Sequence, residues 1–365
     1  MQFENRTGMN LYKKTGTAFL FLTLLVISHF ANAQRTGLFK GNSKDFYTSA
    51  GIGGGSAHYI GDLTPIRYAY YAPYTNVRWN ATGNYTKYFN ENFGARISFT
   101  WARLYGDDFI FAQRNFDKMY RNYVRNLHFR NDVQEFTIAG IWNLKKQYGT
   151  TNQPREKFMP YFSAGLGLIN HNPKAIQSVT IPPVTPSLTV YNQWVSLKPL
   201  NTAGQGLPAI NKKPYSLIAP VIPLAIGFRM KIAQNIDLGF EAGYRITFTD
   251  YLDDVGSDRY PDLTDLASNY GLTSADFSYR ADENFHAVSG QSRIVDFLRA
   301  YTLAGGTSIS VISPNNSAAS IYDPTGANVV RGLGEKFYHR FDMYLTTQVT
   351  INYVLSNRVK CPPIK

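Results

Sequence analysis

Carboxylates are most concentrated in the segment Thr249-Asp250-Tyr251-Leu252-Asp253-Asp254. Oxygen ligands this close together are of the kind that Ca²⁺ prefers, but their order does not match an EF-hand loop. Capping and ion pairing at the end of a strand account for the same residues, and we favour that interpretation. Gly61-Asp62-Leu63 carries a further carboxylate of this type. We therefore predict no metal-binding residues.

Catalytic groups are sparse in the sequence. None of the six histidines is spaced as a metal-ligand pair, and no Gly-x-Ser-x-Gly nucleophile motif occurs; the histidines are His29, His58, His128, His171, His286 and His339. An acyltransferase or protease would need a nucleophile and a base together. His58 with Asp62, or His339 with Asp250, could be proposed. We predict no catalytic or cofactor-binding residues and a protein that is not an enzyme, with an outer-membrane enzyme as the less favoured alternative.

The N-terminus has the pattern of a secretory signal peptide over residues 1–33. A positively charged start precedes the apolar run 17–27, and Ala31-Asn32-Ala33 is a small-residue cleavage site before Gln34. The apolar run is shorter than the roughly 20 residues that a membrane-spanning helix needs. The lone cysteine, Cys361, cannot form an intramolecular disulfide. We predict an exported chain with one domain, 34–365.

The composition favours a membrane interface over a nucleic-acid partner. The chain contains 26 Tyr and 24 Phe, and without residues 1–33 it carries 34 basic and 24 acidic side chains, a net charge of +10. Tyrosine is enriched in the aromatic girdles of membrane proteins. Because zinc spacings, phosphate loops and RNA-reading motifs are absent, we expect no nucleic acid as a partner. Outer-membrane lipid and lipopolysaccharide are the expected partners for the basic charge.

Eight segments alternate between apolar and polar residues, as strands with one apolar and one polar face do. The segments are 46–58, 77–89, 93–104, 133–144, 158–169, 221–232, 236–248 and 340–355. The polar faces carry Arg96, Glu135, Arg229, Lys231, Asp237, Glu241, Arg245 and Asp342. A soluble sandwich could not bury so many charges cheaply, whereas a small barrel can pair them across its lumen. We predict an all-β, eight-stranded antiparallel transmembrane β-barrel, without an open pore.

The connections between these segments alternate in length. Those at 90–92, 145–157 and 233–235 are short, and those at 59–76, 105–132, 170–220 and 249–339 are long. Barrels of the outer membrane have short periplasmic turns and long outer loops. Within the long connections, helical spacing predicts short helices at Asn115–Leu127 and Gln291–Leu303, and the Pro-rich segment 172–217 is expected to be irregular.

Three stretches resemble one known family. They are Gly53-Gly54-Gly55-Ser56-Ala57-His58-Tyr59-Ile60-Gly61-Asp62-Leu63, Arg125-Asn126-Leu127-His128-Phe129-Arg130-Asn131-Asp132, and the block from Gly243 to Val255. They are similar to recurrent blocks of the PorG-like outer-membrane β-barrel family of Bacteroidetes, which is associated with type IX protein secretion. The long connections at 170–220 and 249–339 are longer than is usual there.

The resemblance implies a non-enzymatic barrel in the cell outer membrane, a structural or assembly component of type IX protein secretion or gliding machinery. It implies periplasmic ring lipoproteins of the secretion system as possible protein partners. An alternative is a surface receptor or adhesin-type barrel that binds a partner through its long outer loops.

Overall fold

The computed structural model describes residues 47–64, 75–113, 116–146, 155–177, 193–210, 212–256, 260–281, 283, 285–293, 296, 299, 331–332 and 341–355. The chain divides into two compact units, Met1–Asp45 and Phe46–Lys365. The predicted signal peptide, Cys361 and His339 lie outside the described residues, as does most of the helix expected at Gln291–Leu303.

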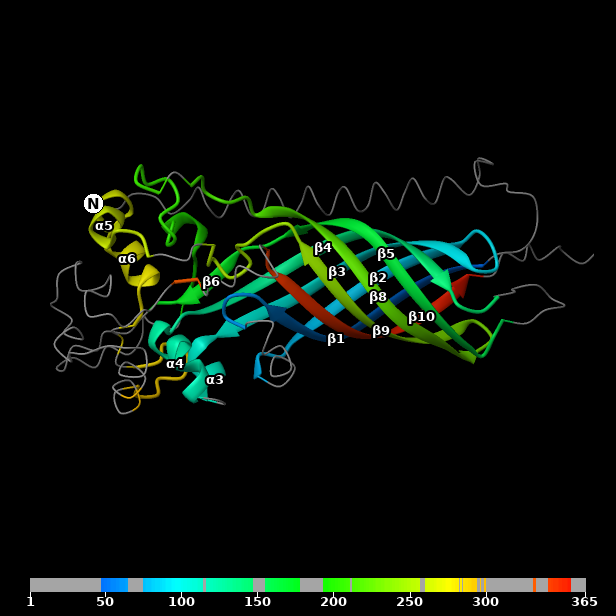
Figure 1. Cartoon of the computed structure of the whole chain (residues 1–365). Helices are drawn as coiled ribbons and strands as arrows, with labels where there is room; N and C mark the ends of the chain where they lie inside the picture. The colour runs from blue at the N-terminus through cyan, green and yellow to red at the C-terminus, as the bar shows by residue number, and fades with distance from the viewer. Residues whose placement is uncertain are drawn as a thin grey trace, which may run out of the picture. The chain divides into compact units, whose positions relative to one another are not determined.

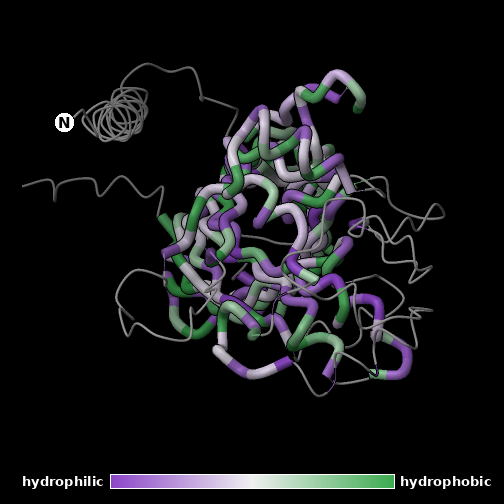
Figure 2. The backbone as a smooth tube through the Cα atoms, turned by 90° about the vertical axis from the view of Figure 1, so that its left-hand side faces the viewer, coloured by the Kyte–Doolittle hydropathy of each residue, from purple (hydrophilic) through white to green (hydrophobic). Residues whose placement is uncertain are grey.

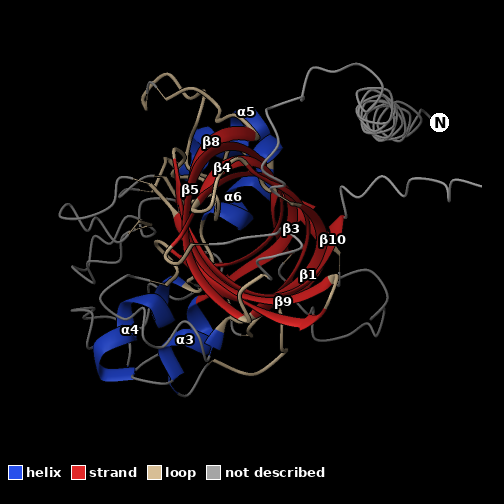
Figure 3. Cartoon of the chain, turned by 90° about the vertical axis from the view of Figure 1, so that its right-hand side faces the viewer, coloured by secondary structure: helices blue, strands red, loops and turns tan. Residues whose placement is uncertain are grey.

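Eight long antiparallel strands close into a barrel. They are β1 (Thr48–Ile60), β2 (Arg78–Tyr88), β3 (Phe93–Asp107), β4 (His128–Asn143), β5 (Phe158–Asn170), β8 (Ile218–Ala233), β9 (Ile236–Thr247) and β10 (Met343–Leu355). Neighbours along the chain pair with each other, β1 pairs with β10, and the β3–β4 pairing completes the ring. Viewed end-on, the strands enclose a lumen (Figure 3). The predicted fold class is confirmed.

The strands agree closely with the alternating segments, and the largest differences lie on one side. β3 continues three residues beyond the predicted end, to Asp107, and β4 begins five residues early, at His128, because the two strands pair directly up to Asp107↔His128. Polar residues at this end obscure the alternation in sequence, but the backbone ladder does not depend on it.

The glycines of β1 allow a close approach of its neighbour. A Cβ atom on Gly53 would lie 2.3 Å from the Val349 carbonyl oxygen, and one on Gly55 would lie 1.9 Å from that of Thr347. Side chains at these positions would separate β1 from β10, the pair that joins the two ends of the barrel sheet. The glycine run therefore marks close backbone contact.

The long connections contain their own structure at one end of the barrel, which we call the outer end (Figure 1). They hold α3 (Asp108–Gln113), α4 (Phe116–Arg125), β6 (Pro173–Ile176), β7 (Trp194–Ser196), the 3₁₀ helix η2 (Lys198–Leu200), α5 (Leu263–Tyr270) and α6 (Leu272–Ser278). The helix expected at Asn115–Leu127 matches α4. The expectation that 172–217 is irregular is wrong in part, because β6 pairs with the extended β4 and β7 pairs with β6. None of the described helices is long and apolar enough to cross a membrane.

Candidate functional site

The outside of the barrel is an apolar belt. Alternate residues of the strands carry large, solvent-accessible apolar side chains; these include Ile52, Phe99, Phe136, Ile138, Trp142, Phe162, Leu166, Ile226, Val349 and Ile351. Hydrophobic and hydrophilic residues are interspersed around the barrel when it is viewed from one end (Figure 2). Exposed apolar surface of this extent marks a lipid or protein interface, and a closed barrel presents it to lipid. The predicted assignment of apolar residues to the outside is confirmed.

One lumen ion pair joins strands on opposite sides of the barrel. Arg96 of β3 pairs with Glu241 of β9, and the Tyr161 hydroxyl donates to the same carboxylate at 2.7 Å. The side chains of Arg96 and Glu241 are only 13% and 9% exposed. Their burial requires this mutual compensation, because an unpaired charge in such a place is costly.

A second lumen pair lies beside the first. Arg245 Nε is 3.3 Å from a Glu135 carboxylate oxygen, and the Tyr344 hydroxyl also donates to Glu135. Arg96, Glu241 and Arg245 line a cavity of about 20 Å³ in the lumen. Such a volume holds about one water molecule, since one needs roughly 10–15 Å³. The lumen at this level is filled by side chains.

Arg229 differs from the prediction, which placed it in the same charge network. Its guanidinium donates to the Tyr47 hydroxyl at 2.9 Å and to Asn143, and it lies 4.8 Å from the centre of the Tyr88 ring. Aromatic faces and neutral oxygens stabilise this cation without a carboxylate. At the same end of the barrel, Asp237 pairs with Arg155.

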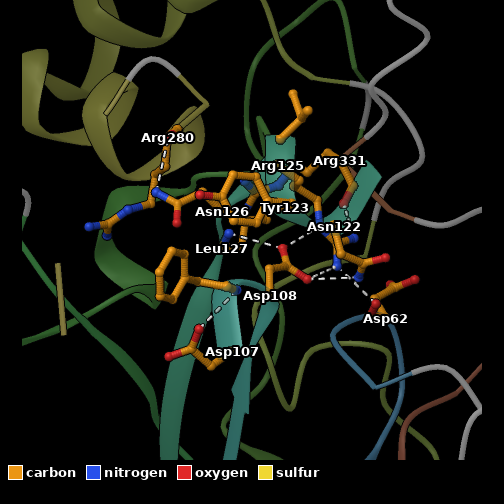
Figure 4. Close-up of polar contacts among 12 residues, drawn as sticks. Asp62, Asp107, Asp108, Asn122, Tyr123, Arg125, Asn126, Leu127, Arg280 and Arg331 are labelled. Atoms are coloured by element: carbon orange, nitrogen blue, oxygen red, sulfur yellow. Dashed lines mark hydrogen bonds and ion pairs between the residues drawn. The ribbon is translucent and has the colours of Figure 1, made fainter. Parts of the chain in front are cut away.

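At the outer end, a fully buried ion pair anchors the connection between β3 and β4. Arg125 Nε and Nη2 each lie 2.7 Å from an Asp108 carboxylate oxygen, and Asn122 donates to Asp108 at 2.8 Å (Figure 4). Arg125 also donates to the backbone carbonyl groups of Asp62 and Arg331, at 2.9 and 2.7 Å. One guanidinium thus joins three of the long connections.

Three further buried arginines bind backbone carbonyl groups of the same connections. Arg280 donates to Ile176 at 2.8 Å, Arg293 donates to Tyr123 at 2.7 Å, and Arg331 donates to Ser278 at 2.7 Å. Arg331 also reaches the Thr202 hydroxyl at 2.6 Å. We call the cluster of Arg125, Asp108, Arg280, Arg293 and Arg331 the outer mouth. It links loops from four long connections into one packed cap.

The carboxylates of Asp253 and Asp342 lie within the barrel end beneath these arginines. The Tyr59 hydroxyl is 2.6 Å from Asp253 Oδ2 and 2.8 Å from Asp342 Oδ1. Burial raises the pKa of Asp253, and burial together with the charge of Asp253 raises the pKa of Asp342. The Tyr59 hydroxyl thus donates to both carboxyl groups, and the raised pKa values mean that each of them binds a proton more readily in the fold than in free solution.

The Asp-rich segment Thr249–Asp254 and Gly61-Asp62-Leu63 therefore lie close together and have structural roles. Asp254 accepts from the Tyr215 hydroxyl at 2.7 Å, and burial raises its pKa against the opposing charge of Arg331. Asn131 donates to the Leu252 carbonyl oxygen at 2.8 Å. The contacts of Asp253 and Asp254 agree with capping and pairing. Within the described residues, no group of three His, Cys, Asp or Glu is arranged to hold a metal ion.

Among the described histidines, the rings of His128 and His286 contact each other edge to face, with their centres 6.1 Å apart. His58 is buried and hydrogen-bonds Ser56 Oγ of the same strand at 2.7 Å, and His128 accepts from the Ile176 amide at 3.0 Å. His171 stacks on Tyr215, and burial lowers its pKa to about 4. His58 lies two residues before the end of β1, the strand that the sequence predicted to end at this residue.

Sequence reasoning missed an Asp–His–Ser row at the outer end. His286 Nε2 is 3.1 Å from Asp107 Oδ2, and His286 Nδ1 is 2.8 Å from Ser289 Oγ. The contacts of Asp107 and Ser289 are explained by the local backbone structure on either side of His286. Ser289 belongs to the turn that follows His286, and Asp107 Oδ1 accepts the Phe109 and Ile110 amides at the start of α3.

The buried arginines of the outer mouth were also missed, because an isolated arginine in a loop has no sequence signature that distinguishes it from a solvent-exposed one. Arg125 alone stands in a stretch that the family resemblance singled out.

No protein-family model and no curated protein matches this chain. Among solved structures, the chain is similar to the Neisserial surface protein A (NspA), at 8% identity and a TM-score of 0.32, over 84% of this chain and 96% of that one. It is also similar to Ail, the attachment invasion locus protein of Yersinia pestis, solved with the heparin analogue sucrose octasulfate. That match has 10% identity and a TM-score of 0.28, over 55% of this chain and 88% of the other. Similarities this distant carry no functional argument.

Proposed function

We propose that the chain is a non-enzymatic barrel of the cell outer membrane, with a structural or assembly role in type IX protein secretion or gliding. The observation that carries the structural role is the lumen, where Arg96–Glu241 and Arg245–Glu135 fill the interior with paired charge. A barrel filled in this way serves as a rigid membrane anchor rather than a conduit. The secretion role rests on the resemblance to PorG-like proteins.

The short turns supply the surface for periplasmic ring lipoproteins. In the turn between β4 and β5, Lys145, Lys146 and Lys157 are exposed, whereas Arg155 is turned inward against Asp237. The lysines can therefore steer an acidic partner, and Arg155 stabilises the turn that presents them.

Deletion of the gene tests this proposal. We expect impaired secretion of type IX cargo, with the mature chain starting near Gln34 and fractionating with the outer membrane. Reversing the charge of Lys145 and Lys146 should reduce recovery of ring lipoproteins in a detergent pull-down, while Lys212→Glu, an exposed outer-end control, should not. Normal secretion and gliding after deletion would refute the assembly role.

A second candidate is a surface receptor or adhesin, and the outer mouth favours it. Buried arginines hold the long connections in a defined arrangement, and recognition loops positioned on a rigid scaffold are typical of binding proteins. For this function, deletion should alter surface binding or adhesion while secretion stays intact. An outer-membrane enzyme is tested by assaying the purified protein for lipid or peptide cleavage. We expect none, and cleavage that Ser289→Ala abolishes would assign the enzyme instead.

A further inference from the structure

Basic and aromatic side chains gather at the outer end of the barrel, beside the exposed Trp79 and Trp101, and Tyr105 among them is buried. We call this group the aromatic–basic patch; it consists of Arg78, Arg103, Arg130, Lys174, Asp132, Trp79, Tyr105 and Trp194. Its members come from β2, β3, β4, β6 and β7. Trp79 packs edge-on against Trp101 at 5.4 Å, and these rings are 39% and 43% exposed. The patch therefore begins where an aromatic girdle meets the headgroup region.

The cations of the patch lie over aromatic rings. Arg130 Cζ is 4.3 Å from the centre of the Trp194 ring, and Arg78 Cζ is 3.9 Å from that of Tyr105. The Trp194 and Tyr105 rings contact each other at 6.5 Å. Stacking on rings holds the guanidinium groups in place while leaving N–H donors available.

Strand register brings the remaining cations beside Arg130. Lys174 is its direct partner in the β4–β6 pairing, and Tyr105 is its partner on β3, two residues from Arg103. Because directly paired residues of a sheet point to the same face, these positive charges are neighbours.

The negative charge at the patch is smaller than the positive charge. Arg103 binds Asp132 through two hydrogen bonds, at 2.6 and 3.0 Å, and both side chains are about one-third exposed. Arg78, Arg130 and Lys174 form no ion pair within the described part of the chain. Four cations against one carboxylate leave a net charge of +3. Arg130 Nε is also buried without a hydrogen-bond acceptor.

We propose that the aromatic–basic patch binds the phosphate groups of a phosphorylated glycolipid of the outer leaflet, the lipid A part of lipopolysaccharide. A phosphate offers several oxygen acceptors and negative charge beyond that of Asp132, the carboxylate that acts on Arg130, and guanidinium groups bind it in a bidentate manner. The acyl chains of the same lipid would lie against the apolar belt directly below. This inference rests on the proposed outer-membrane location and requires no role in secretion.

The test is native mass spectrometry of the full-length mature protein in non-ionic detergent, with diphosphorylated lipid A, dephosphorylated lipid A or phosphatidylcholine added. We expect retained adducts with diphosphorylated lipid A only. Lys174→Gln should weaken that binding about tenfold, and adding Arg130→Gln should weaken it about tenfold more, as loss of a charge-assisted hydrogen bond predicts.

Lys145→Gln with Lys146→Gln is the matched control, because it removes two exposed charges at the opposite end. Arg130→Lys retains the charge and should bind with intermediate strength, and heat-modifiability on gels establishes that each variant is folded. Competition by inorganic phosphate alone, at the same phosphate concentration, should be weak if the lipid is the ligand.

Equal binding of dephosphorylated and diphosphorylated lipid A would overturn the proposal, as would an equal loss of binding in the control variant. Displacement of lipid A by inorganic phosphate at equal concentration would assign the patch to the free ion instead. The two proposals can fail separately. If gene deletion leaves secretion intact while the purified protein still binds diphosphorylated lipid A, the assembly role is refuted and this inference stands.

Discussion

In the lumen, Arg96 and Arg245 each pair with a carboxylate on another strand, whereas in the outer mouth Arg293 donates to backbone carbonyl groups of the loops, and Arg280 binds both the Glu283 carboxylate and the Ile176 carbonyl group. The difference follows from what each region must satisfy. Strands satisfy their own backbone, so lumen side chains need only to compensate one another. Buried loops leave carbonyl oxygens without partners, and arginine, with five donors, satisfies several of them at once.

The two regions should therefore respond separately to mutation. Damage to a lumen pair acts on strands that are joined around the whole ring. Damage to the outer mouth acts on loops that are attached to the barrel, whose own stability does not depend on them. Unfolding of the barrel and proteolysis of the loops measure these effects independently.

Arg125→Ala should have the largest effect. It leaves the Asp108 carboxylate buried without its partner and removes the bonds to Asp62 and Arg331, and loss of one partner of a buried pair costs about 3–5 kcal/mol. Limited proteolysis should cut the outer loops faster, while the barrel retains its heat-modifiability on gels. Arg121→Ala, an exposed change on the same helix, is the control. If the barrel of this variant unfolds together with the loops, the lumen and the outer mouth do not respond separately to mutation.

Glu241→Ala should lower the stability of the barrel itself. It leaves Arg96 without its carboxylate, and because that guanidinium is slightly exposed we expect the lower part of the range of about 3–5 kcal/mol. The measurement is the unfolding midpoint in denaturant, with the exposed Asp265→Ala as control.

Wild-type protein should show no steady conductance in planar bilayers, and a stable large channel would mean that the lumen is open.

Phe240→Arg tests the face that meets lipid. Phe240 lies mid-strand on the outside and stacks on Phe228 at 5.0 Å. An arginine near the bilayer midplane costs about 2–4 kcal/mol, and one near an interface costs about 0–1 kcal/mol. Folding into vesicles should therefore be impaired by Phe240→Arg and hardly changed by Ile236→Arg, at the end of the same strand. Equal folding of both variants would reverse the assignment of inside and outside.

The smallest effect is expected from pH. The pKa values of Asp253 and Asp342 are raised in the fold, so the folded state binds more protons than the unfolded chain. The stability of the outer end should fall as pH rises from about 4 through the raised pKa values. Asp342→Asn removes one of the two coupled carboxyl groups and should flatten the pH dependence of loop proteolysis. An unchanged pH profile would mean that the raised pKa of Asp342 does not contribute to the stability of the outer end.

The sequence by itself determined the barrel. A side-chain period of two fixes which residues of a strand share a face, so Phe240 and Glu241 could be assigned to opposite faces without knowledge of any contact. The lengths of the connections also follow directly from where alternation stops. The period of two shows which face a side chain occupies but not which side chain it meets across the lumen. The sequence therefore predicted charged residues in the lumen but not their partners, and Arg229 was assigned to the wrong kind of partner.

Only the tertiary structure decided the outer end. Arg125, Arg280 and Arg331 are far apart in the chain, and nothing in their local sequence distinguishes a guanidinium that will be buried from one that will be solvated. The pairing of Arg130 with Lys174 depends on β6 joining an extended β4, which the Pro-rich segment did not predict. Strand faces depend on local geometry, which the sequence encodes directly, whereas loop contacts depend on which distant segments the closed barrel brings together.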